Sequence, residues 1–252
     1  MPDVSHRGCN IHYEAEGSGP LIVLQHGFFS NQSRWKEQGY VDGLKDSFTV
    51  ATIDSLGHGQ SDRPAQSERY GLKERAGDIV AVIDALDEDK AHVLGYSMGG
   101  WLAVGVAMHY PDRLTSLTIA GWDCVEGMGS VFRAMGIDPM SFETFLGAAR
   151  AVAPDLVEWV TDDDLEGFAA CYVELGDLAG SEKAVLDLDV PVLLWDGRED
   201  PYHASMEAFA TEHGFEFLST PGDHIGAMDA SAVEVVIALR AFIAKPTGTS
   251  RL

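Results

Sequence analysis

One short segment of the sequence combines the residue types and the spacing of a nucleophilic site. Ser97 lies in Gly95–Gly99 (GYSMG), directly after an apolar run that ends at Leu94 and before an apolar, helix-like segment from Trp101. A sharp turn from strand to helix strains the backbone of its central residue, and glycines two positions away on each side remove side chains that would collide there. The helix N-terminus also favours a developing negative charge. We therefore predict that Ser97 is a catalytic nucleophile.

A serine hydroxyl is a weak nucleophile, so it needs a general base and an acidic group that orients the base. His224 lies in a loop after the last predicted strand, and Asp200 lies just beyond the apolar run that ends at Trp195. Loops that leave the carboxyl ends of parallel strands meet at one edge of a sheet. Both side chains can therefore converge on Ser97, and we predict a triad in which His224 is the base and Asp200 orients it.

Other residues compete for these two roles. His203 is the nearest rival among the nine histidines, but it lies only three residues after Asp200 on the same loop. Asp123 is the main alternative acid, because it follows the apolar run at 117–119 and can also reach the histidine. Asp196 and Glu199 are further alternatives. Asp200 remains the predicted acid.

The negative oxygen of a tetrahedral intermediate needs two backbone N–H donors. One is expected from Met98, the residue after the nucleophile. The other is expected from Phe28, in the loop that follows the apolar run at 21–24. His26 begins the same loop and is expected to bond nearby backbone rather than to take part in the reaction.

Apolar runs and turn signals place these loops on a sheet. Short continuous runs, typical of strands covered on both faces, recur at 21–24, 49–53, 92–94, 117–119 and 192–195. Phe215 and Phe217 mark one more strand, and alternation over 9–13 marks a partly exposed one near the start. Helical patterns lie between these runs, which predicts an α/β fold: a mostly parallel, doubly wound sheet with helices on both faces.

Three helices of this predicted fold have distinct patterns. Residues 72–86 repeat apolar side chains at spacings of three and four, and 101–108 is apolar on all sides and stops before Pro111. In the last helix, Ser231 and Glu234 have the spacing of a capping box. Its buried stripe is expected to include Val233 and Ile237.

The interval between the runs at 117–119 and 192–195 is too long for a simple crossover. It holds helical patterns at 142–152 and 165–172, and an acidic run, Asp162–Asp164, of the kind that starts a helix. We predict one domain over 1–252, in which residues 122–190 form a small helical cap above the carboxyl edge of the sheet. Phe29 and Trp122 are predicted to bind substrate beneath it, and 245–252 is expected to be a flexible tail.

The composition limits the kinds of partner that we expect the protein to bind. With 17 Lys and Arg against 40 Asp and Glu, the formal net charge is −23. Such a surface repels phosphate backbones and anionic membranes, so neither nucleic acid nor membrane is expected as a partner. The three cysteines have no metal-like spacing, and neither a signal peptide nor a membrane span is apparent, which favours a cytoplasmic location.

These motifs together resemble the α/β-hydrolase superfamily, over about residues 21–242. The resemblance is to small serine esterases, haloperoxidase-like perhydrolases, and lactone or carbon–carbon bond hydrolases. It rests on His26-Gly27, on the turn at 54–62 (DSLGHGQSD), on 95–100 (GYSMGG), and on the loops around Asp200 and His224. It implies an α/β-hydrolase fold in which the run at 117–119 is the sixth strand and the cap is inserted after it.

Two departures narrow the resemblance. Serine at position 97 argues against haloalkane dehalogenases, which place aspartate there. Trp101 stands where a similar menaquinone-pathway lyase usually has arginine, which argues against that lyase. We expect a hydrolase that cleaves carboxylic esters through an acyl-enzyme, without metal or organic cofactor, acting on a small-molecule ester or related acyl substrate. Lactone, perhydrolase and carbon–carbon bond chemistry remain alternatives, as does a non-catalytic receptor, and a homodimer stays open.

Overall fold

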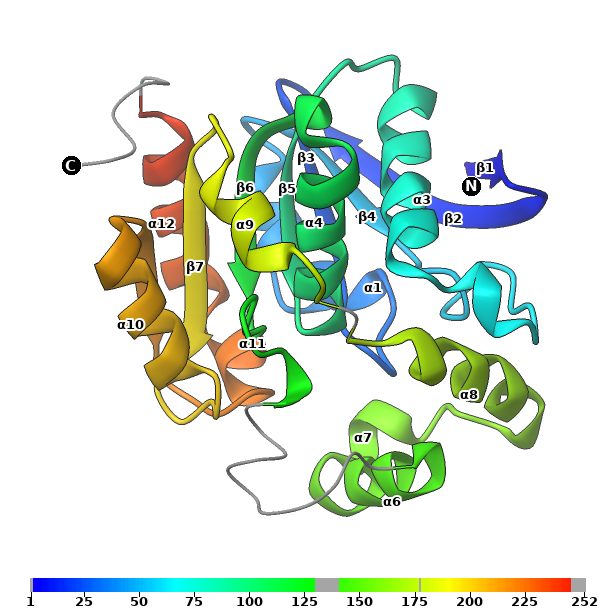
Figure 1. Ribbon diagram of the computed structural model, residues 1–252. Helices are drawn as coiled ribbons and strands as arrows, with labels where there is room; N and C mark the ends of the chain where they lie inside the picture. Colours follow the sequence, from blue (N-terminus) through cyan, green and yellow to red (C-terminus); the bar gives the residue numbers. More distant parts are fainter. Residues whose placement is uncertain (1, 130–140, 177, 246–252) are drawn as a thin grey trace.

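An eight-stranded sheet forms the centre of the molecule (Figure 1). The computed structural model describes residues 2–129, 141–176 and 178–245. The strands run in the order β1-β2-β4-β3-β5-β6-β7-β8; β1, β2 and β4 pair antiparallel and all other neighbours pair parallel. Their bounds are β1 Asp3–His6, β2 Cys9–Gly17, β3 Leu21–Gln25, β4 Thr49–Ile53, β5 Ala91–Tyr96, β6 Leu114–Ala120, β7 Val192–Gly197 and β8 Glu216–Thr220.

This arrangement confirms the predicted fold class and the seven strands expected from the sequence. Strand β1 was not predicted, because Val4 is the one apolar residue among its four. Pairing with β2, from Asp3 opposite His12 to His6 opposite Cys9, holds β1 at the edge of the sheet.

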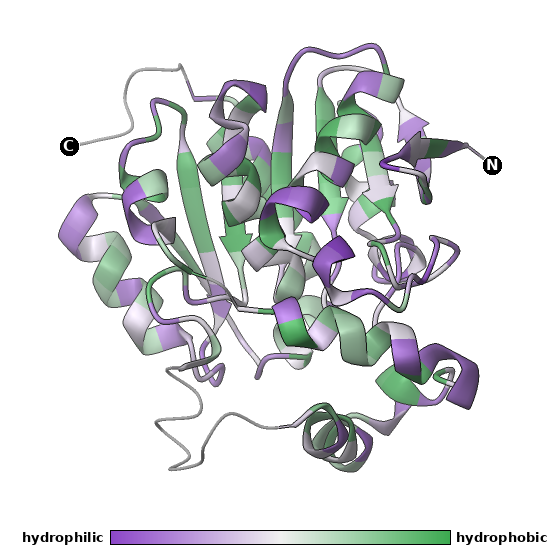
Figure 2. Cartoon of the chain, turned by 45° about the vertical axis from the view of Figure 1, so that its right-hand side comes forward, coloured by the Kyte–Doolittle hydropathy of each residue, from purple (hydrophilic) through white to green (hydrophobic). Residues whose placement is uncertain are grey.

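Helices cover both faces of the sheet (Figures 1 and 2). Helices α3, α4, α9 and α10 pack on one face, and α2, α11 and α12 on the other. The longer helices are α3 Leu72–Ala85, α4 Met98–His109, α6 Phe142–Val152, α8 Leu165–Glu174, α10 His203–His213 and α12 Ala232–Ile243. The shorter ones are α1 Ser33–Glu37, α2 Tyr40–Leu44, α7 Pro154–Val157, α9 Ser181–Leu186 and α11 Gly226–Ala230, with 3-10 turns at Ser67–Arg69, Pro111–Arg113 and Asp162–Asp164.

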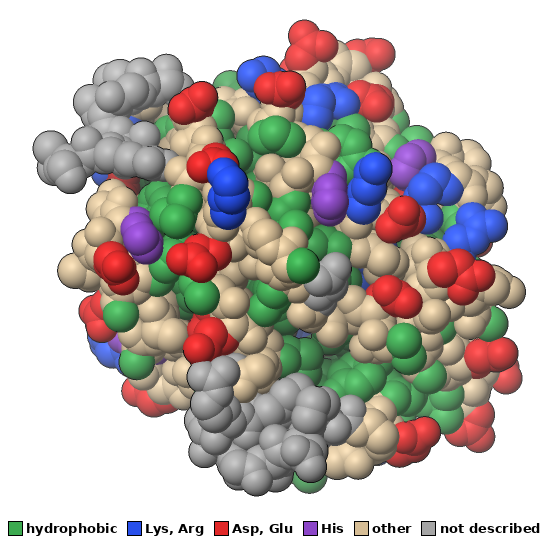
Figure 3. Space-filling model, in the orientation of Figure 1, with side chains coloured by type: hydrophobic (Ala, Val, Ile, Leu, Met, Phe, Trp, Pro, Cys, Tyr) green, Lys and Arg blue, Asp and Glu red, His purple; other side chains and the backbone are tan. Residues whose placement is uncertain are grey.

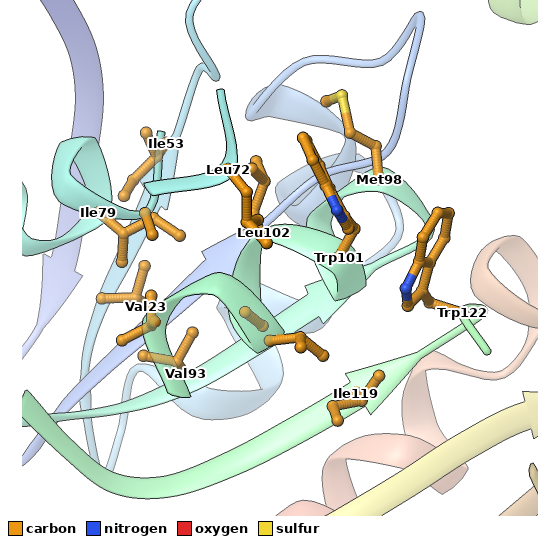
Figure 4. Close-up of a cluster of buried hydrophobic side chains, with 14 of the residues drawn as sticks. Val23, Ile53, Leu72, Ile79, Val93, Met98, Trp101, Leu102, Ile119 and Trp122 are labelled. Atoms are coloured by element: carbon orange, nitrogen blue, oxygen red, sulfur yellow. The ribbon is translucent and has the colours of Figure 1, made fainter. Parts of the chain in front are cut away.

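Two apolar layers hold the helices to the sheet. Side chains alternate along each buried strand, so Leu21 and Val23 face the α3–α4 layer while Ile22 and Leu24 face the α12 layer. Figure 4 shows the first layer, in which Val93 and Ile119 of the sheet lie beneath α3 and α4. This packing fixes the start of α4, and with it Ser97, against the strand ends.

The last helix corrects two of our predictions. Val233 and Ile237 are 77% and 64% exposed, and the buried face is formed by Val235, Leu239 and Phe242 instead. The side chain of Ser231 makes no capping hydrogen bond. Its backbone (φ −110°, ψ 11°) is not the extended conformation that directs an N-cap side chain back to the helix.

Helices α6, α7 and α8 lie beyond the carboxyl ends of the strands, whereas α9 packs against α4 (Figure 1). The acidic run at 162–164 begins a helix as predicted: Thr161 and Asp164 form a capping box just before α8. The division into one domain with a cap over 122–190 stays a prediction, and the tail residues 246–252 lie outside the described part of the chain.

Acidic side chains are scattered over the face shown in Figure 3 rather than gathered in one patch. Within the described residues, no helix has both the length and the apolar character needed to span a membrane.

Candidate active site

The turn between β5 and α4 has the strained geometry that its sequence predicts. Ser97 has φ 59° and ψ −120°, a conformation that side-chain-bearing residues rarely adopt. A Cβ on Gly95 would lie 1.8 Å from the carbonyl oxygen of Gly99, and a Cβ on Gly99 would lie 2.1 Å from the carbonyl oxygen of Gln25. The two flanking glycines therefore allow the backbone approach on which the turn depends.

Ser97, His224 and Asp200 form one hydrogen-bonded chain. The Oγ of Ser97 lies 2.9 Å from Nε2 of His224, and Nδ1 of His224 lies 2.7 Å from Oδ2 of Asp200. A carboxylate only accepts hydrogen bonds, so Nδ1–H donates to Asp200 and Nε2 is left to accept the serine proton. The backbone N–H of Tyr202 donates to the second oxygen of Asp200 at 3.0 Å, which fixes the carboxylate.

Charge raises the basicity of His224. Burial alone lowers the pKa of its imidazole, but the neighbouring carboxylate of Asp200 and the hydrogen bond to it outweigh burial and raise the pKa above its ordinary value. The imidazole must be neutral to accept a proton from Ser97. A reaction that uses this base therefore fades as the pH falls through the raised pKa of His224.

The rival residues have other partners. Asp123 accepts hydrogen bonds from the N–H groups of Val125 and Glu126, both at 2.8 Å. His203 Nε2 lies 2.8 Å from Ser219 Oγ, and Glu199 accepts from Gly222 N–H at 2.7 Å. The structure thus brings Asp200, rather than Asp123 or Glu199, to the histidine beside Ser97.

The loop after β3 lies directly against Ser97. A Cβ on Gly27 would lie 3.1 Å from that of Ser97. Gly27–Ser30 forms a turn in which Ser30 N–H donates to Gly27 O, and Phe29 has φ 59°. Among the hydrogen bonds of the described residues, none has the N–H of Phe28 or Met98 as its donor. Two amides near Ser97 are thus left without acceptors, as two oxyanion donors would be.

His26 ties this loop to the loop after β4. The backbone N–H of Ser55 donates to His26 Nε2 at 3.0 Å, so Nδ1 carries the proton and donates to Gly27 O at 2.7 Å. The bond that Nε2 accepts from Ser55 needs a neutral imidazole, because both ring nitrogens of a protonated histidine are donors. This geometry agrees with the role that we expected of His26, which is to bond nearby backbone.

We expect buried neutral histidines to make the fold sensitive to acid. Burial lowers the pKa of His26 and of His92 to about 4 and holds that of His58 well below its ordinary 6.5. Between pH 6.5 and 4 the unfolded chain binds protons that the folded chain cannot bind, so the free energy of unfolding falls as the pH falls. A pKa lowered from 6.5 to about 4 corresponds to about 3 kcal/mol per histidine. Urea unfolding at pH 7.5, 6 and 5 measures the slope.

His92→Gln is the matched control for that slope. His92 lies away from Ser97 and bonds Ser116 Oγ at 2.8 Å, which glutamine can also reach. The variant should lose stability less steeply with acid than wild type. An identical slope in the two proteins would contradict the assignment of a lowered pKa to His92.

The two predicted substrate-binding residues lie in apolar surroundings. Phe29 is 1% exposed; its ring stacks on Phe145 of α6, and its carbonyl accepts from the indole N–H of Trp159 at 3.0 Å. Trp122 is 3% exposed beside Trp101 in the layer of Figure 4, and within the described residues its indole N–H has no acceptor. Phe29 joins the loop after β3 to α6 and to Trp159, and a substrate contact by either Phe29 or Trp122 stays a prediction.

Two residues near the site were not predicted. Tyr96 donates its hydroxyl proton to the carbonyl oxygen of His224 at 2.8 Å, which fixes the loop that carries the base. Arg75 is buried in α3 and contacts the side chain of Met98. The sequence does contain a sign that Arg75 is unusual. It lies three residues after Leu72 and four before Ile79, so its charge falls on the apolar face of the helix.

Among the described residues, no group of three or more His, Cys, Asp or Glu side chains is arranged to hold a metal ion. The expectation of a reaction without a cofactor rests on the chemistry of the triad and stays a prediction.

Known proteins similar to this chain include hydrolases and a synthase. The family model described as "alpha/beta hydrolase fold" matches residues 20–159. A protein assigned as 2-succinyl-6-hydroxy-2,4-cyclohexadiene-1-carboxylate synthase in Bacillus subtilis is 33% identical over 113 residues, which are 43% of this chain and only 40% of that protein. The 3-oxoadipate enol-lactonase 2 of Acinetobacter baylyi is 25% identical over 210 residues, 77% of each chain. A thermophilic esterase from Thermogutta terrifontis is 24% identical and superposes with a TM-score of 0.75 over 96% of this chain and 97% of its own, a likeness of fold.

Proposed function

Because the chain belongs to the alpha/beta hydrolase fold family, we propose that it is a serine hydrolase that cleaves carboxylic esters through an acyl-enzyme. The observation that carries the proposal is the continuous hydrogen-bonded chain from Ser97 through His224 to Asp200. The strained backbone of Ser97 at the start of α4 supports it, because that geometry directs a nucleophile out of the sheet edge.

Each group of the chain has one chemical task. As Oγ of Ser97 bonds to the ester carbonyl carbon, its proton passes to Nε2 of His224 and the carbonyl electron pair moves onto oxygen. Asp200 holds the imidazole in the required tautomer and stabilises the imidazolium. His224 then protonates the leaving alkoxide. Water attacks the acyl-enzyme by the same steps, which frees the acid and restores Ser97.

The developing oxyanion is proposed to accept from the N–H groups of Phe28 and Met98. Their lack of acceptors among the described residues supports this role, because a preorganised donor is free before the reaction begins. For the substrate we propose a small molecule whose acyl part contacts Phe29 and Trp122. The buried indole N–H of Trp122, which has no acceptor among the described residues, supports the second contact.

A lactone is the second candidate substrate. The match to an enol-lactonase over 77% of both chains favours it. The same steps apply to a cyclic ester, except that the leaving alkoxide stays tethered to the acyl group until water releases the product. The triad alone does not separate the two classes.

A substrate panel tests the proposal. We expect wild-type protein to release 4-nitrophenol from acetate, butyrate or hexanoate esters, or to open a γ- or δ-lactone, with Ser97→Ala assayed beside it. Ester turnover with no lactone opening identifies an esterase, and the reverse result identifies a lactonase. A folded wild-type protein that turns over neither class, and that no fluorophosphonate labels at Ser97, would contradict a serine hydrolase.

A further inference from the structure

Arg75 is a buried cation on the α4 side of α3. The whole residue is 1% exposed, and the guanidinium lies 6.0 Å from the ring centroid of Tyr70 and 5.8 Å from that of Trp101. Its Nη2 donates to Ser55 Oγ at 2.5 Å, and Nη1 approaches Cys171 Sγ at 3.3 Å. A charge at this depth is unusual, because removing a guanidinium from water carries a large desolvation penalty.

No ion pair neutralises the charge of Arg75 within the described part of the chain. Among the same residues, its buried Nε has no hydrogen-bond partner. Its contacts are a hydroxyl, a thiol, a thioether and two aromatic faces. A buried ion without an ion-pair partner destabilises a fold relative to an apolar side chain of similar volume. Packing alone therefore does not explain why an arginine occupies this buried position.

The position of Arg75 relates it to the site. Nη2 lies 3.2 Å from Sδ of Met98, the residue whose backbone N–H follows the nucleophile. It also contacts Ser55, whose own N–H holds His26 beside Gly27. After burial, which is the main cause, the charge of Arg75 further lowers the pKa of His26 and of His58. The field of this cation thus reaches His26, which bonds the carbonyl of Gly27 beside Ser97.

We propose that Arg75 is a positioning residue whose uncompensated charge stabilises the oxyanion formed on the Ser97 adduct. This inference rests on the proposed function. When Oγ of Ser97 bonds to the carbonyl carbon, the carbonyl electron pair moves onto oxygen and the serine proton moves to His224. The negative charge so created lies beside the amides of Met98 and Phe28. A fixed cation behind Met98 favours that state over the neutral substrate.

The alternative role for Arg75 is to bind a carboxylate group of the substrate instead of stabilising the oxyanion. The geometry favours the oxyanion, because Nη1 and Nη2 already point to Cys171, Ser55 and Met98. A bound carboxylate would have to displace these contacts, whereas an electrostatic effect on the oxyanion needs no rearrangement. The two anions predict different kinetics, which the substrates can separate.

The test compares Arg75→Met, which keeps the apolar stem and removes the charge, with Arg75→Lys, which keeps the charge. We measure the rate at which a fluorophosphonate phosphonylates Ser97 with loss of fluoride, and kcat and KM for 4-nitrophenyl hexanoate and 4-nitrophenyl hydrogen adipate. In Arg75→Met we expect labelling and kcat to fall about 10- to 100-fold for both esters, with KM within about twofold. Arg75→Lys should recover most of the loss.

Cys171→Ala is the matched structural control, because it removes a neutral neighbour of the guanidinium from α8 and leaves the charge in place. It should change kcat by less than about twofold. Should Arg75→Met fail to fold, Arg75→Gln provides a second neutral variant. Equal labelling rates in wild type and a folded neutral variant would overturn the inference.

Two further results would also overturn it. A KM increase in Arg75→Met that is confined to the adipate ester would mean that Arg75 binds a substrate carboxylate. A loss of kcat in Cys171→Ala as large as that in Arg75→Met would mean that Arg75 acts through packing. A wild-type protein that reacts with neither the probe nor the esters would instead contradict the proposed function, and the role of Arg75 with it.

Discussion

Replacing Ser97 by alanine is expected to lower kcat/KM for the best ester or lactone by about 10⁵- to 10⁶-fold. The whole proposed reaction passes through Oγ, and no other hydroxyl is hydrogen-bonded to Nε2 of His224 among the described residues. Members of a triad act as a unit, so removing the nucleophile costs as much as removing all three. Steady-state rates measure the loss, and mass spectrometry of the intact protein measures the acyl adduct that wild type should carry and the variant should lack.

Stability provides the control for this result. Alanine at position 97 keeps a Cβ and the backbone strain of φ 59°, so the free energy of unfolding should change by less than about 1 kcal/mol. Ser47→Ala, at an exposed serine, should match wild type in both rate and stability. If Ser97→Ala retained wild-type turnover and an acyl adduct on another residue, the nucleophile would have to be sought elsewhere.

The buried strands and the position of Ser97 were accessible to sequence reasoning for a physical reason. Runs such as 21–24 and 192–195 are buried on both faces, so their composition alone marks them as strands. The turn at Gly95 and Gly99 is constrained by backbone contact, so only glycine fits at these positions and the motif is visible in the sequence. Local rules decide both features.

Features that depend on a distant partner were harder to predict. Helix α12 is rich in apolar residues, so its sequence does not say which side packs, and its contact with α2 buries Val236 while Val233 stays exposed. The burial of Arg75 was not predicted, because the spacing of apolar residues says nothing about a charged residue on the same helix face. The choice between Asp123 and Asp200 also depended on geometry, since both follow strands at the same sheet edge.

Asp200→Asn is expected to lower kcat by about 10³- to 10⁴-fold, the second large effect. The asparagine amide can donate to Nδ1 of His224, which leaves the proton on Nε2 and prevents that atom from accepting the proton of Ser97. The side chain of Asp200 is 0% exposed, so its charge acts on the imidazole with little screening. Loss of that charge removes the main cause that raises the pKa of His224, so the acid limb of the rate profile should move to lower pH. A rate profile from pH 5 to 9 measures both changes.

Two neighbouring carboxylates allow a matched comparison at the same sheet edge. Asp123 and Asp196 are each 1% exposed, and each has one oxygen without a hydrogen-bond partner within the described residues. Burial, and then the nearby charge of Asp200, raise the pKa of Asp196 well above its ordinary value, which disfavours its charged form. Because His224 bonds Asp200 instead, replacing Asp196 by asparagine should change kcat by less than about tenfold. Asp123→Asn should likewise leave the acid limb in place, because Asp123 bonds backbone N–H groups rather than His224. A loss in Asp123→Asn equal to that in Asp200→Asn, with the same shift of the acid limb, would transfer the orienting role to Asp123 and leave Ser97 and His224 in theirs.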